Sequence, residues 1–200
     1  MKLLHIDASI TATLSVSRTL SDAIVRRLRH TIPDLQVIRR DLYADPLPHL
    51  SLSNLPTSHP MAAATAESPD AAAASQAVLD EFLAADIVVI GAPMYNFTIP
   101  SQLKAWVDRI LVPGQTFAYG ADGVKGLAAG KRVILAISRG GIYGPDSPAA
   151  AAEHAESYLR TIFGFIGITA PELIVAEGLQ MGPEQRGRAL EAAHRMAEAL

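Results

Sequence analysis

Short apolar runs of strand length recur along this chain with amphipathic helical patterns between them, and this alternation constrains the fold more than any other feature. We predict strands at Lys2–Asp7, Ile87–Ile90, Val133–Ile137 and Leu173–Ala176, and a further strand that contains Val37 and Ile38 and ends near Asp41. Such alternation is typical of right-handed β-α-β units around a parallel sheet. Residues 87–90 are apolar at successive positions, so helices should cover both faces of this strand. The sequence therefore predicts an α/β fold.

The helices are predicted from apolar residues at helical spacing. They are a helix ending before Pro33, one at about Ala71–Ala85, one from Pro100 to near Pro113, one through Ala155–Ile166, and a last one that Pro183 opens and that carries Leu190, Ala193 and Met196. The Ala149–Ala152 run is read as helix-forming composition. Tyr43–Pro69 is an excursion without periodicity, and Gly114–Gly130 is a glycine-rich insertion. Neither side of the excursion is long enough for a second domain, so we expect one domain over residues 1–200.

Composition and charge argue against several classes of function. A net charge of −3 without a basic stripe does not suit a nucleic-acid partner. The absence of cysteine excludes disulfides and thiol catalysis and fits a reducing compartment. No apolar run approaches the roughly 18 residues of a membrane span, and the run at the N-terminus is too short for a signal peptide. We expect a soluble, cytoplasmic protein with a small-molecule partner.

Three turns follow predicted strands, and in an open parallel sheet such turns meet at one edge, where ligands bind. The first turn, Ala8–Arg18, places Ser9, Ser15 and Ser17 just before a helix. Hydroxyls and free N–H groups thus converge on a helix N-terminus, which suits a phosphate. The turn lacks the glycines of a dinucleotide-binding motif and the lysine of a P-loop. Simple capping of the helix by Ser15 or Ser17 explains this turn alone equally well.

The second turn, within GAPMYNFTIP at Gly91–Pro100, is unusual because it contains Met94, Tyr95 and Phe97 where small polar residues are normal. An aromatic residue in a loop most often plugs the end of a sheet. This turn, however, follows the central strand, and Asn96 adds an amide that can donate and accept hydrogen bonds. The alternative interpretation is a flat apolar ligand at this position.

The third turn is SRGG, Ser138–Gly141, after the fourth predicted strand. Gly140 and Gly141 let the backbone approach a planar ligand and leave N–H groups free to bind it. Arg139 is given a role in the loop only, because its side chain can equally point to solvent. Together the turns describe a phosphate end, a flat apolar middle and backbone donors, the parts of flavin mononucleotide (FMN). A nicotinamide dinucleotide would need a second phosphate loop, and ATP would need magnesium ligands.

These turns carry a family resemblance that runs essentially end to end. The chain resembles the FMN-dependent NADH-azoreductases, flavodoxin-like quinone and azo-dye reductases formerly called acyl carrier protein phosphodiesterases, in LLHIDAS, SVSR, GAPMYNFTIPSQLKAWVDRI, ISRGGIY, FGFIGI and AEGLQMGPE. MYNF and SRGG, each after a strand, are the most specific of these motifs. The resemblance implies a flavodoxin-like three-layer α/β/α sandwich with a five-stranded parallel sheet in the order 2-1-3-4-5.

The resemblance also implies which residues bind the flavin, from its phosphate to its polar edge. They are Ser9, Ser15, Val16, Ser17, Met94, Tyr95, Asn96, Phe97, Ser138, Arg139, Gly140 and Gly141. It further implies tightly bound, non-covalent FMN, NADH as electron donor, and a homodimer with the flavin near the interface. The chain departs from the family at Ile10 and most of all in Tyr43–Pro69, which leaves its substrate preference open.

In such a family the flavin carries the chemistry, so no catalytic side chain is implied. NADH binds and leaves first, and a quinone or azo compound then occupies the same place. A quinone needs one such cycle, and an azo bond needs two. In keeping with this, the sequence shows neither a nucleophile–base pair nor a metal-ligand pattern among its six histidines. A flavodoxin-like electron carrier and a hydrolase stay open as rival hypotheses, although such carriers are usually strongly acidic. The physiological acceptor and the preference for NADH or NADPH are left open.

Four further aromatic residues have two possible roles. Phe117 and Tyr119 in the insertion either close the partner subunit's pocket, which we favour, or pack locally as an ordinary hairpin. Phe163 and Phe165 face the same choice, and packing in the helix core is favoured for at least one of them.

Overall fold

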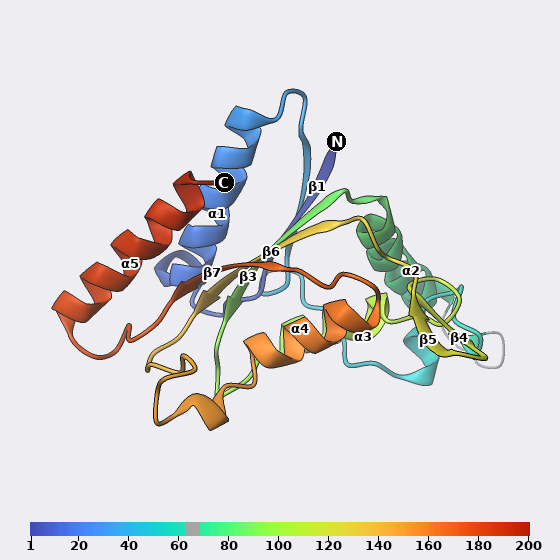
Figure 1. Ribbon diagram of the computed structural model, residues 1–200. Helices are drawn as coiled ribbons and strands as arrows, with labels where there is room; N and C mark the ends of the chain where they lie inside the picture. Colours follow the sequence, from blue (N-terminus) through green and yellow to red (C-terminus); the bar gives the residue numbers. More distant parts are fainter. Residues whose placement is uncertain (63–68) are drawn as a thin grey trace.

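Five parallel strands form a central sheet in the order β2-β1-β3-β6-β7 in a computed structural model that describes residues 1–62 and 69–200 (Figure 1). The strands are β1 (Lys2–Asp7), β2 (Gln36–Asp41), β3 (Ile87–Pro93), β6 (Arg132–Ser138) and β7 (Glu172–Ala176). The predicted order 2-1-3-4-5 is confirmed, because β6 and β7 are the fourth and fifth strands of this sheet. β3 and β6 run further than predicted, since their pairing continues to Pro93 and Ser138.

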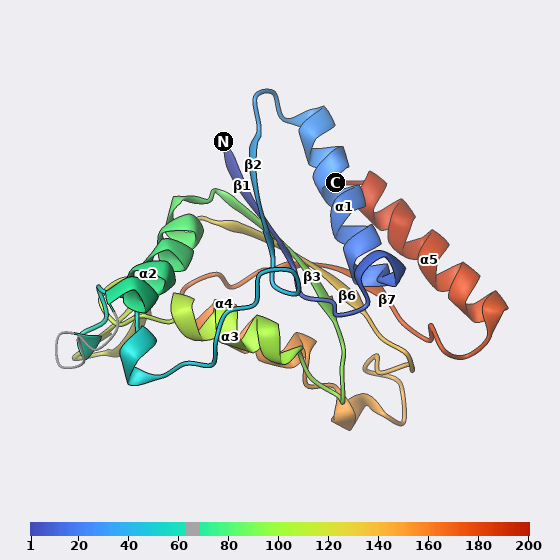
Figure 2. The same ribbon diagram turned by 180° about the vertical axis from the view of Figure 1, so that it is seen from behind.

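Helices cover both faces of the sheet, as predicted (Figures 1 and 2). On one face lie α1 (Val16–Thr31) and α5 (Pro183–Glu198), and on the other lie α2 (Pro69–Ala84), α3 (Ser101–Ile110) and α4 (Glu156–Phe165). Neighbouring strand residues point to opposite faces, so Val89 packs with α1 and α5 while Val88 packs with α2, α3 and α4. Each such fully buried apolar side chain contributes about 1.5–3 kcal/mol. Residues 87–90 of β3 are apolar at every position for this reason.

The register of the sheet brings the carboxyl ends of its strands to one edge. Asp7 pairs with Gly91, Pro93 with Ser138, and Ser138 with Ala176. The turns after β1, β3, β6 and β7 therefore begin side by side. The N-termini of α1 and α5 lie at the same edge (Figure 1). This is the edge at which the sequence predicts a ligand.

Two segments interrupt the alternation. The Gly114–Gly130 insertion forms an antiparallel hairpin of β4 (Phe117–Gly120) and β5 (Gly123–Gly126), which is a separate two-stranded sheet. A Cβ atom on Gly126 would lie 2.1 Å from the backbone nitrogen of Gly167, so only glycine lets the hairpin approach the end of α4 this closely. The Tyr43–Pro69 excursion contains a 3₁₀ turn at Leu52–Asn54, and its residues 63–68 lie outside the described part of the chain.

Some local predictions were wrong. Pro100 is the N-cap of α3 and does not lie in its first turn. The alanine run at 149–152 forms only a 3₁₀ turn, Ala150–Ala152. Met196 is 46% exposed, because α5 buries its Ala193 and Ala197 instead. These small residues are four apart on the buried side of the helix, which lets α5 pack closely with α1.

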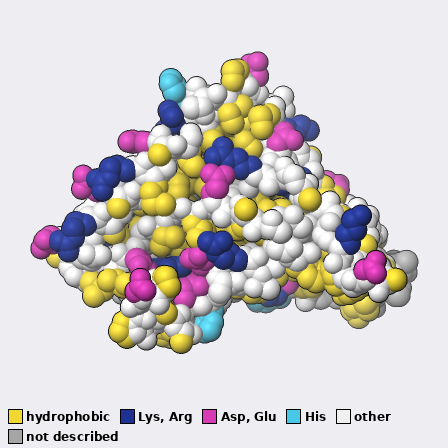
Figure 3. All heavy atoms as spheres, in the orientation of Figure 1, with side chains coloured by type: hydrophobic (Ala, Val, Ile, Leu, Met, Phe, Trp, Pro, Cys, Tyr) yellow, Lys and Arg dark blue, Asp and Glu magenta, His cyan; other side chains and the backbone are white. Residues whose placement is uncertain are grey.

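The surface shows a mixed distribution of charge. On the face in Figure 3, Lys and Arg side chains of the described residues lie singly among acidic and hydrophobic groups and form no continuous stripe. No helix among the described residues combines the length and the hydropathy needed to cross a bilayer.

Candidate functional site

The loop after β1 forms the polar end of the candidate site. Ser15 caps α1, since its Oγ accepts a hydrogen bond from the Arg18 N–H at 3.2 Å; it also shares a hydrogen bond of 3.1 Å with the Ser17 Oγ. The N–H groups of Val16 and Ser17 precede the first intrahelical bond, and they have no protein acceptor among the described residues. The capping interpretation is thus correct for Ser15, and it still leaves two donors at the helix N-terminus free.

Ser9 joins this loop to the turn after β3. Its buried Oγ lies 3.0 Å from the Thr11 Oγ1 and 3.0 Å from the Tyr95 hydroxyl. The Met94 N–H in turn donates to the Ser138 carbonyl at 2.8 Å. Hydrogen bonds therefore connect the turns after β1, β3 and β6, the three turns that the sequence predicts to meet.

The turn after β3 holds Asn96 and Phe97 at φ angles of 47° and 73°, which non-glycine residues rarely adopt. Two backbone hydrogen bonds of 2.9 and 3.1 Å between Tyr95 and Thr98 close it, and a turn this tight needs positive φ at both central residues. The N–H groups of Asn96 and Phe97 have no protein acceptor in the described part of the chain. Phe97 is 52% exposed, with its ring edge-on to Tyr143 at 6.3 Å. It does not plug the sheet.

Gly140 and Gly141 bring the turn after β6 close to the segment after β7. The Gly140 carbonyl accepts from the Gln180 N–H at 2.9 Å, and the Gly141 carbonyl from the Gly178 N–H at 2.8 Å. A Cβ on Gly140 would lie 3.0 Å from the Gln180 side chain, and one on Gly141 3.1 Å from the Tyr143 ring. The N–H groups of both glycines lack a protein acceptor among the residues described. A larger residue at either position would thus have to displace a neighbouring side chain, and both positions offer free donors.

Arg139 does not point to solvent, the orientation that the sequence left open. Its guanidinium is 3% exposed and lies 2.7 Å from Glu156 and 3.3 Å from both Glu153 and Glu177. Three carboxylates more than compensate its charge. Arg139 therefore ties the turn after β6 to the start of α4 and the end of β7, and adds no net positive charge to the site.

Two adjoining cavities lie between these turns. The first, of about 180 Å³, is lined by Ser9, Thr11, Ser15, Val16, Pro93, Met94, Tyr95, Ser138, Arg139, Gly140, Leu179, Gln180 and Arg186. The second, of about 550 Å³, is lined by Ile10, Met94, Tyr95, Asn96, Phe97, Gly140, Gly141, Tyr143 and Gln180. Because Met94, Tyr95, Gly140 and Gln180 line both, the two form one site. The described residues that line the two cavities include no carboxylate and no histidine.

All predicted site residues line these cavities except Ser17, which is fully buried and hydrogen-bonded to Ser15. The structure adds residues that the sequence did not indicate. Leu179 and Gln180 follow β7 at the same edge, so the strand-end argument, applied to the last strand, would have found them. Arg186 reaches the site only because of how α5 packs, for which the sequence carries no signal.

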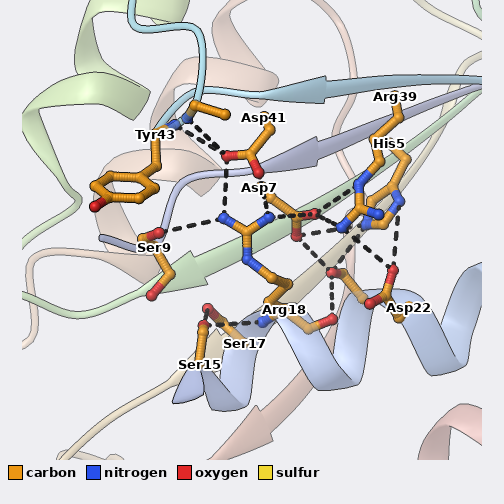
Figure 4. A network of polar contacts seen from close by, with 12 residues as sticks. His5, Asp7, Ser9, Ser15, Ser17, Arg18, Asp22, Arg39, Asp41 and Tyr43 are labelled. Atoms are coloured by element: carbon orange, nitrogen blue, oxygen red, sulfur yellow. Dashed lines mark hydrogen bonds and ion pairs between the residues drawn. The ribbon is translucent and has the colours of Figure 1, made fainter. Parts of the chain in front are cut away.

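A network of ion pairs supports the polar end (Figure 4). The Arg18 guanidinium lies 2.6 Å from Asp41 and 3.3 Å from Asp7, and it donates to the Ser9 carbonyl at 3.3 Å. Asp7 also accepts a 2.7 Å bond from Arg39. Arg18 thus links the ends of β1 and β2 to the loop that carries Ser9, and two carboxylates neutralise its charge.

Asp7 is fully buried yet ionised. Burial alone would raise its pKa, but the neighbouring His5, with hydrogen bonds from Arg39 and Ser21, lowers the pKa of Asp7 to about 2. Among the described residues, His5, Asp7 and Asp22 form the one group with donor atoms close enough together for a metal ion. The Asp7 oxygens are occupied by Arg39 and Ser21, and the His5 Nε2 lies 2.9 Å from the Ser21 Oγ. We therefore assign this group a structural role.

The four aromatic residues with open roles separate clearly. Phe117 is buried and packs against Phe165 at 4.7 Å and Tyr119 at 5.5 Å, and its role at the partner subunit's pocket stays a prediction. Phe163 is fully buried in the core, which confirms core packing for one of that pair. Tyr119 is 74% exposed, and Phe165 is 37% exposed. None of the four lines the two cavities.

The donor set fits a flavin mononucleotide. The polar end offers hydroxyls of Ser9 and Ser15 and the free N–H groups of Val16 and Ser17, and the described residues that line it include no carboxylate to repel a phosphate. The wider cavity has an exposed Phe97 ring on one side and free backbone N–H groups on the other, as a flat heterocycle with a polar edge requires.

A parallel sheet in this order, with such a cavity beyond the ends of its strands, defines the class of flavodoxin-like proteins. In agreement, a family model described as flavodoxin-like fold matches residues 1–200. The FMN-dependent NADH:quinone oxidoreductase of Gluconacetobacter diazotrophicus is 62% identical over 100% of this chain and 99% of that protein. The chain therefore belongs to the flavodoxin-like family of FMN-dependent NADH:quinone oxidoreductases and NADH-azoreductases.

Solved structures agree with this assignment. An azoreductase from Bacillus anthracis strain Sterne has a TM-score of 0.87 and 32% identity, with both chains covered completely. An FMN-dependent NADH-azoreductase from Bacillus anthracis strain Ames Ancestor, solved in complex with FMN, also has a TM-score of 0.87, at 27% identity over 99% of this chain and 96% of that one.

Proposed function

We propose that this protein is an FMN-dependent NADH:quinone oxidoreductase and azoreductase whose cofactor occupies the two joined cavities. The observation that carries the proposal is the meeting of three strand-end turns around one site with a hydroxyl-rich end and an aromatic end. The names of the relatives support the same activity. The domain of residues 1–200 forms one FMN-binding unit in this proposal.

Each turn has a part in holding the cofactor. Ser9 and the loop Ser15–Ser17 bind the phosphate, Met94–Phe97 border the ring system, and Ser138–Gly141 bind its polar edge. Tyr95 spans two of these regions, because its hydroxyl is bonded to Ser9 while its backbone belongs to the aromatic turn. A single side chain thus fixes the distance between the phosphate end and the ring end.

The chemistry that bound FMN supplies is two-electron transfer, in a ping-pong sequence, from NADH to a quinone in one cycle or to an azo bond in two. A quinone, NADH and one proton give the hydroquinone and NAD⁺. An azo compound, two NADH and two protons give two amines and two NAD⁺. The free N–H groups of Asn96, Gly140 and Gly141 would stabilise negative charge that develops on bound FMN. The described linings hold no carboxylate or histidine, and the hydroxyl groups that line the wider cavity include those of Tyr95 and Tyr143.

A homodimer with the site near its interface is part of the proposal. Large apolar side chains next to the cavities are exposed, among them Leu14 at 84%, Phe97 at 52% and Ile10 at 48%. A third cavity of about 570 Å³ shares Ile10, Tyr95 and Asn96 with the second and continues along the start of α3. Exposed apolar surface of this kind marks a protein interface. We also place the enzyme in the cytoplasm, where NADH is produced.

Steady-state kinetics test the proposed function. With menadione and with a model azo dye, we expect parallel double-reciprocal plots, one NADH consumed per quinone and two per azo bond. Repeating the assay with NADPH measures the preference for the donor. Oxidation of NADH that requires a separate redox protein would instead favour an electron carrier, and a chain that neither takes up FMN nor oxidises NADH would contradict the proposal.

A further inference from the structure

Three arginines lie at or beside the polar end of the site, and two of them are neutralised. Arg18 pairs with Asp7 and Asp41 (Figure 4), and Arg139 pairs with three glutamates. Arg186 lines the first cavity, and its guanidinium has neither a hydrogen-bond partner nor a carboxylate partner among the described residues. Arg186 is exposed, and within the described lining it is the one charged side chain without a protein counter-ion; its charge is positive.

The position of Arg186 in its helix is unfavourable for a cation. It is the fourth residue of α5, whose N-terminus carries the positive end of the helix dipole. The acidic residue of the first turn, Glu184, pairs with Arg188 on the next turn. Because the N-termini of α5 and α1 lie at the same edge of the sheet (Figure 1), Arg186 is brought to the loop that caps α1. A bound anion would compensate this placement.

We infer that Arg186 is the cationic ligand of the cofactor's phosphate and that it selects FMN over riboflavin. This inference rests on the proposed FMN function. The serine hydroxyls and the N–H groups of Val16 and Ser17 supply hydrogen bonds but no full charge, whereas a guanidinium adds paired, charge-assisted bonds to phosphate oxygens. Riboflavin has no phosphate, so Arg186 gives it no comparable gain.

The test measures the binding of FMN and of riboflavin to flavin-free protein through the quenching of flavin fluorescence. In Arg186→Gln we expect the Kd for FMN to rise about ten-fold or more while the Kd for riboflavin stays at the wild-type value. Arg186→Lys should recover part of the affinity, because a lysine keeps the charge but not the paired geometry. Added salt should weaken FMN binding more steeply in the wild type than in Arg186→Gln.

Arg188→Gln is the matched control, since Arg188 lies on the same helix, is paired with Glu184 and does not line the cavity. It should bind FMN as the wild type does. If flavin-free Arg186→Gln unfolds at or above the wild-type unfolding temperature, the loss of FMN affinity does not come from a loss of folding. Equal FMN affinity in Arg186→Gln and wild type, or an equal loss for FMN and riboflavin, would overturn the inference. A wild type that binds neither flavin would overturn the proposed function and this inference together.

Discussion

Asp7 is a buried carboxylate whose charge depends on its neighbours. Burial raises its pKa, but His5, Arg39 and Ser21 together lower the pKa from 3.8 to about 2. Since the pKa is lower in the folded protein than in the unfolded chain, the charged carboxylate stabilises the fold fully above pH 3.8. This contribution is lost as the pH falls through about 2. A shift of this size corresponds to about 2 kcal/mol.

We predict that Asp7→Asn lowers the free energy of unfolding at pH 7 by about 3 kcal/mol, because Arg18 and Arg39 lose their buried partner. Between pH 4 and pH 2, the free energy of unfolding should also fall less in the variant than in the wild type. Urea unfolding at several pH values measures both effects. Asp122→Asn serves as control, because Asp122 is exposed and has no ion-pair partner among the described residues. An unchanged acid profile in Asp7→Asn would contradict the assignment.

Phe97 combines a strained backbone with an exposed ring, which points to a role outside folding. Glycine at this position relieves the positive φ by about 1 kcal/mol but removes the contact with Tyr143, which is worth a similar amount. We predict that Phe97→Gly changes the free energy of unfolding of the flavin-free protein by less than about 1 kcal/mol. The Kd for FMN and the KM for quinone should both rise. A large loss of stability with unchanged FMN binding would show that the ring serves the fold.

At the scale of the elements, α3 anchors the long excursion through one buried side chain. Arg109 is 1% exposed, and burial lowers its pKa. Its guanidinium donates to the Pro48 carbonyl at 2.8 Å, the Ser75 Oγ at 3.1 Å and the Ala105 carbonyl at 2.7 Å. The excursion, α2 and α3 are therefore connected by one cation that has no carboxylate hydrogen-bond partner among the described residues.

We predict that Arg109→Ala lowers the free energy of unfolding by about 3 kcal/mol, since it leaves buried acceptors unpaired. The segment around Pro48 should also become more sensitive to limited proteolysis. Arg26→Ala, at an exposed position of α1, should change stability by less than about 0.5 kcal/mol. If both variants lose the same stability and neither is cleaved faster, Arg109 does not anchor the excursion.

The regular elements could be predicted because each has a periodic apolar pattern. β1 matches the prediction to the residue, and β2, α1 and α2 lie where the apolar spacing predicts them. The pattern carried no signal for contacts that depend on packing between elements. The close approach of α5 to α1 through Ala193 and Ala197, and the contact of the hairpin with Gly167, are of this kind.

At the scale of the whole molecule, the exposed apolar side chains around the site predict self-association. Sedimentation should give twice the chain mass of 21.2 kDa for the FMN-loaded protein. Leu14→Arg, next to the site, should lower the dimer fraction. Met196→Arg, at an exposed apolar residue on α5, should leave it unchanged. A monomer at micromolar concentration in the wild type would contradict the dimer proposal.

The site as a whole was predictable to the extent that strand ends determine it. The turns after β1, β3 and β6 meet because parallel strands in this order bring their carboxyl ends together. The charges behind them were not predictable. The guanidinium of Arg139 was expected in a loop and is bound by three glutamates, and Arg186 enters from a helix that is remote in sequence. Such pairings depend on side chains that only the folded structure brings together.

The central claim is that the three turns together bind one redox-active FMN, and an anaerobic titration tests it most directly. The FMN-loaded protein should contain one FMN per chain, lose its yellow absorbance on addition of one equivalent of NADH, and regain it with one equivalent of menadione. Absorbance that NADH leaves unchanged, or a chain that takes up no FMN, would contradict the account.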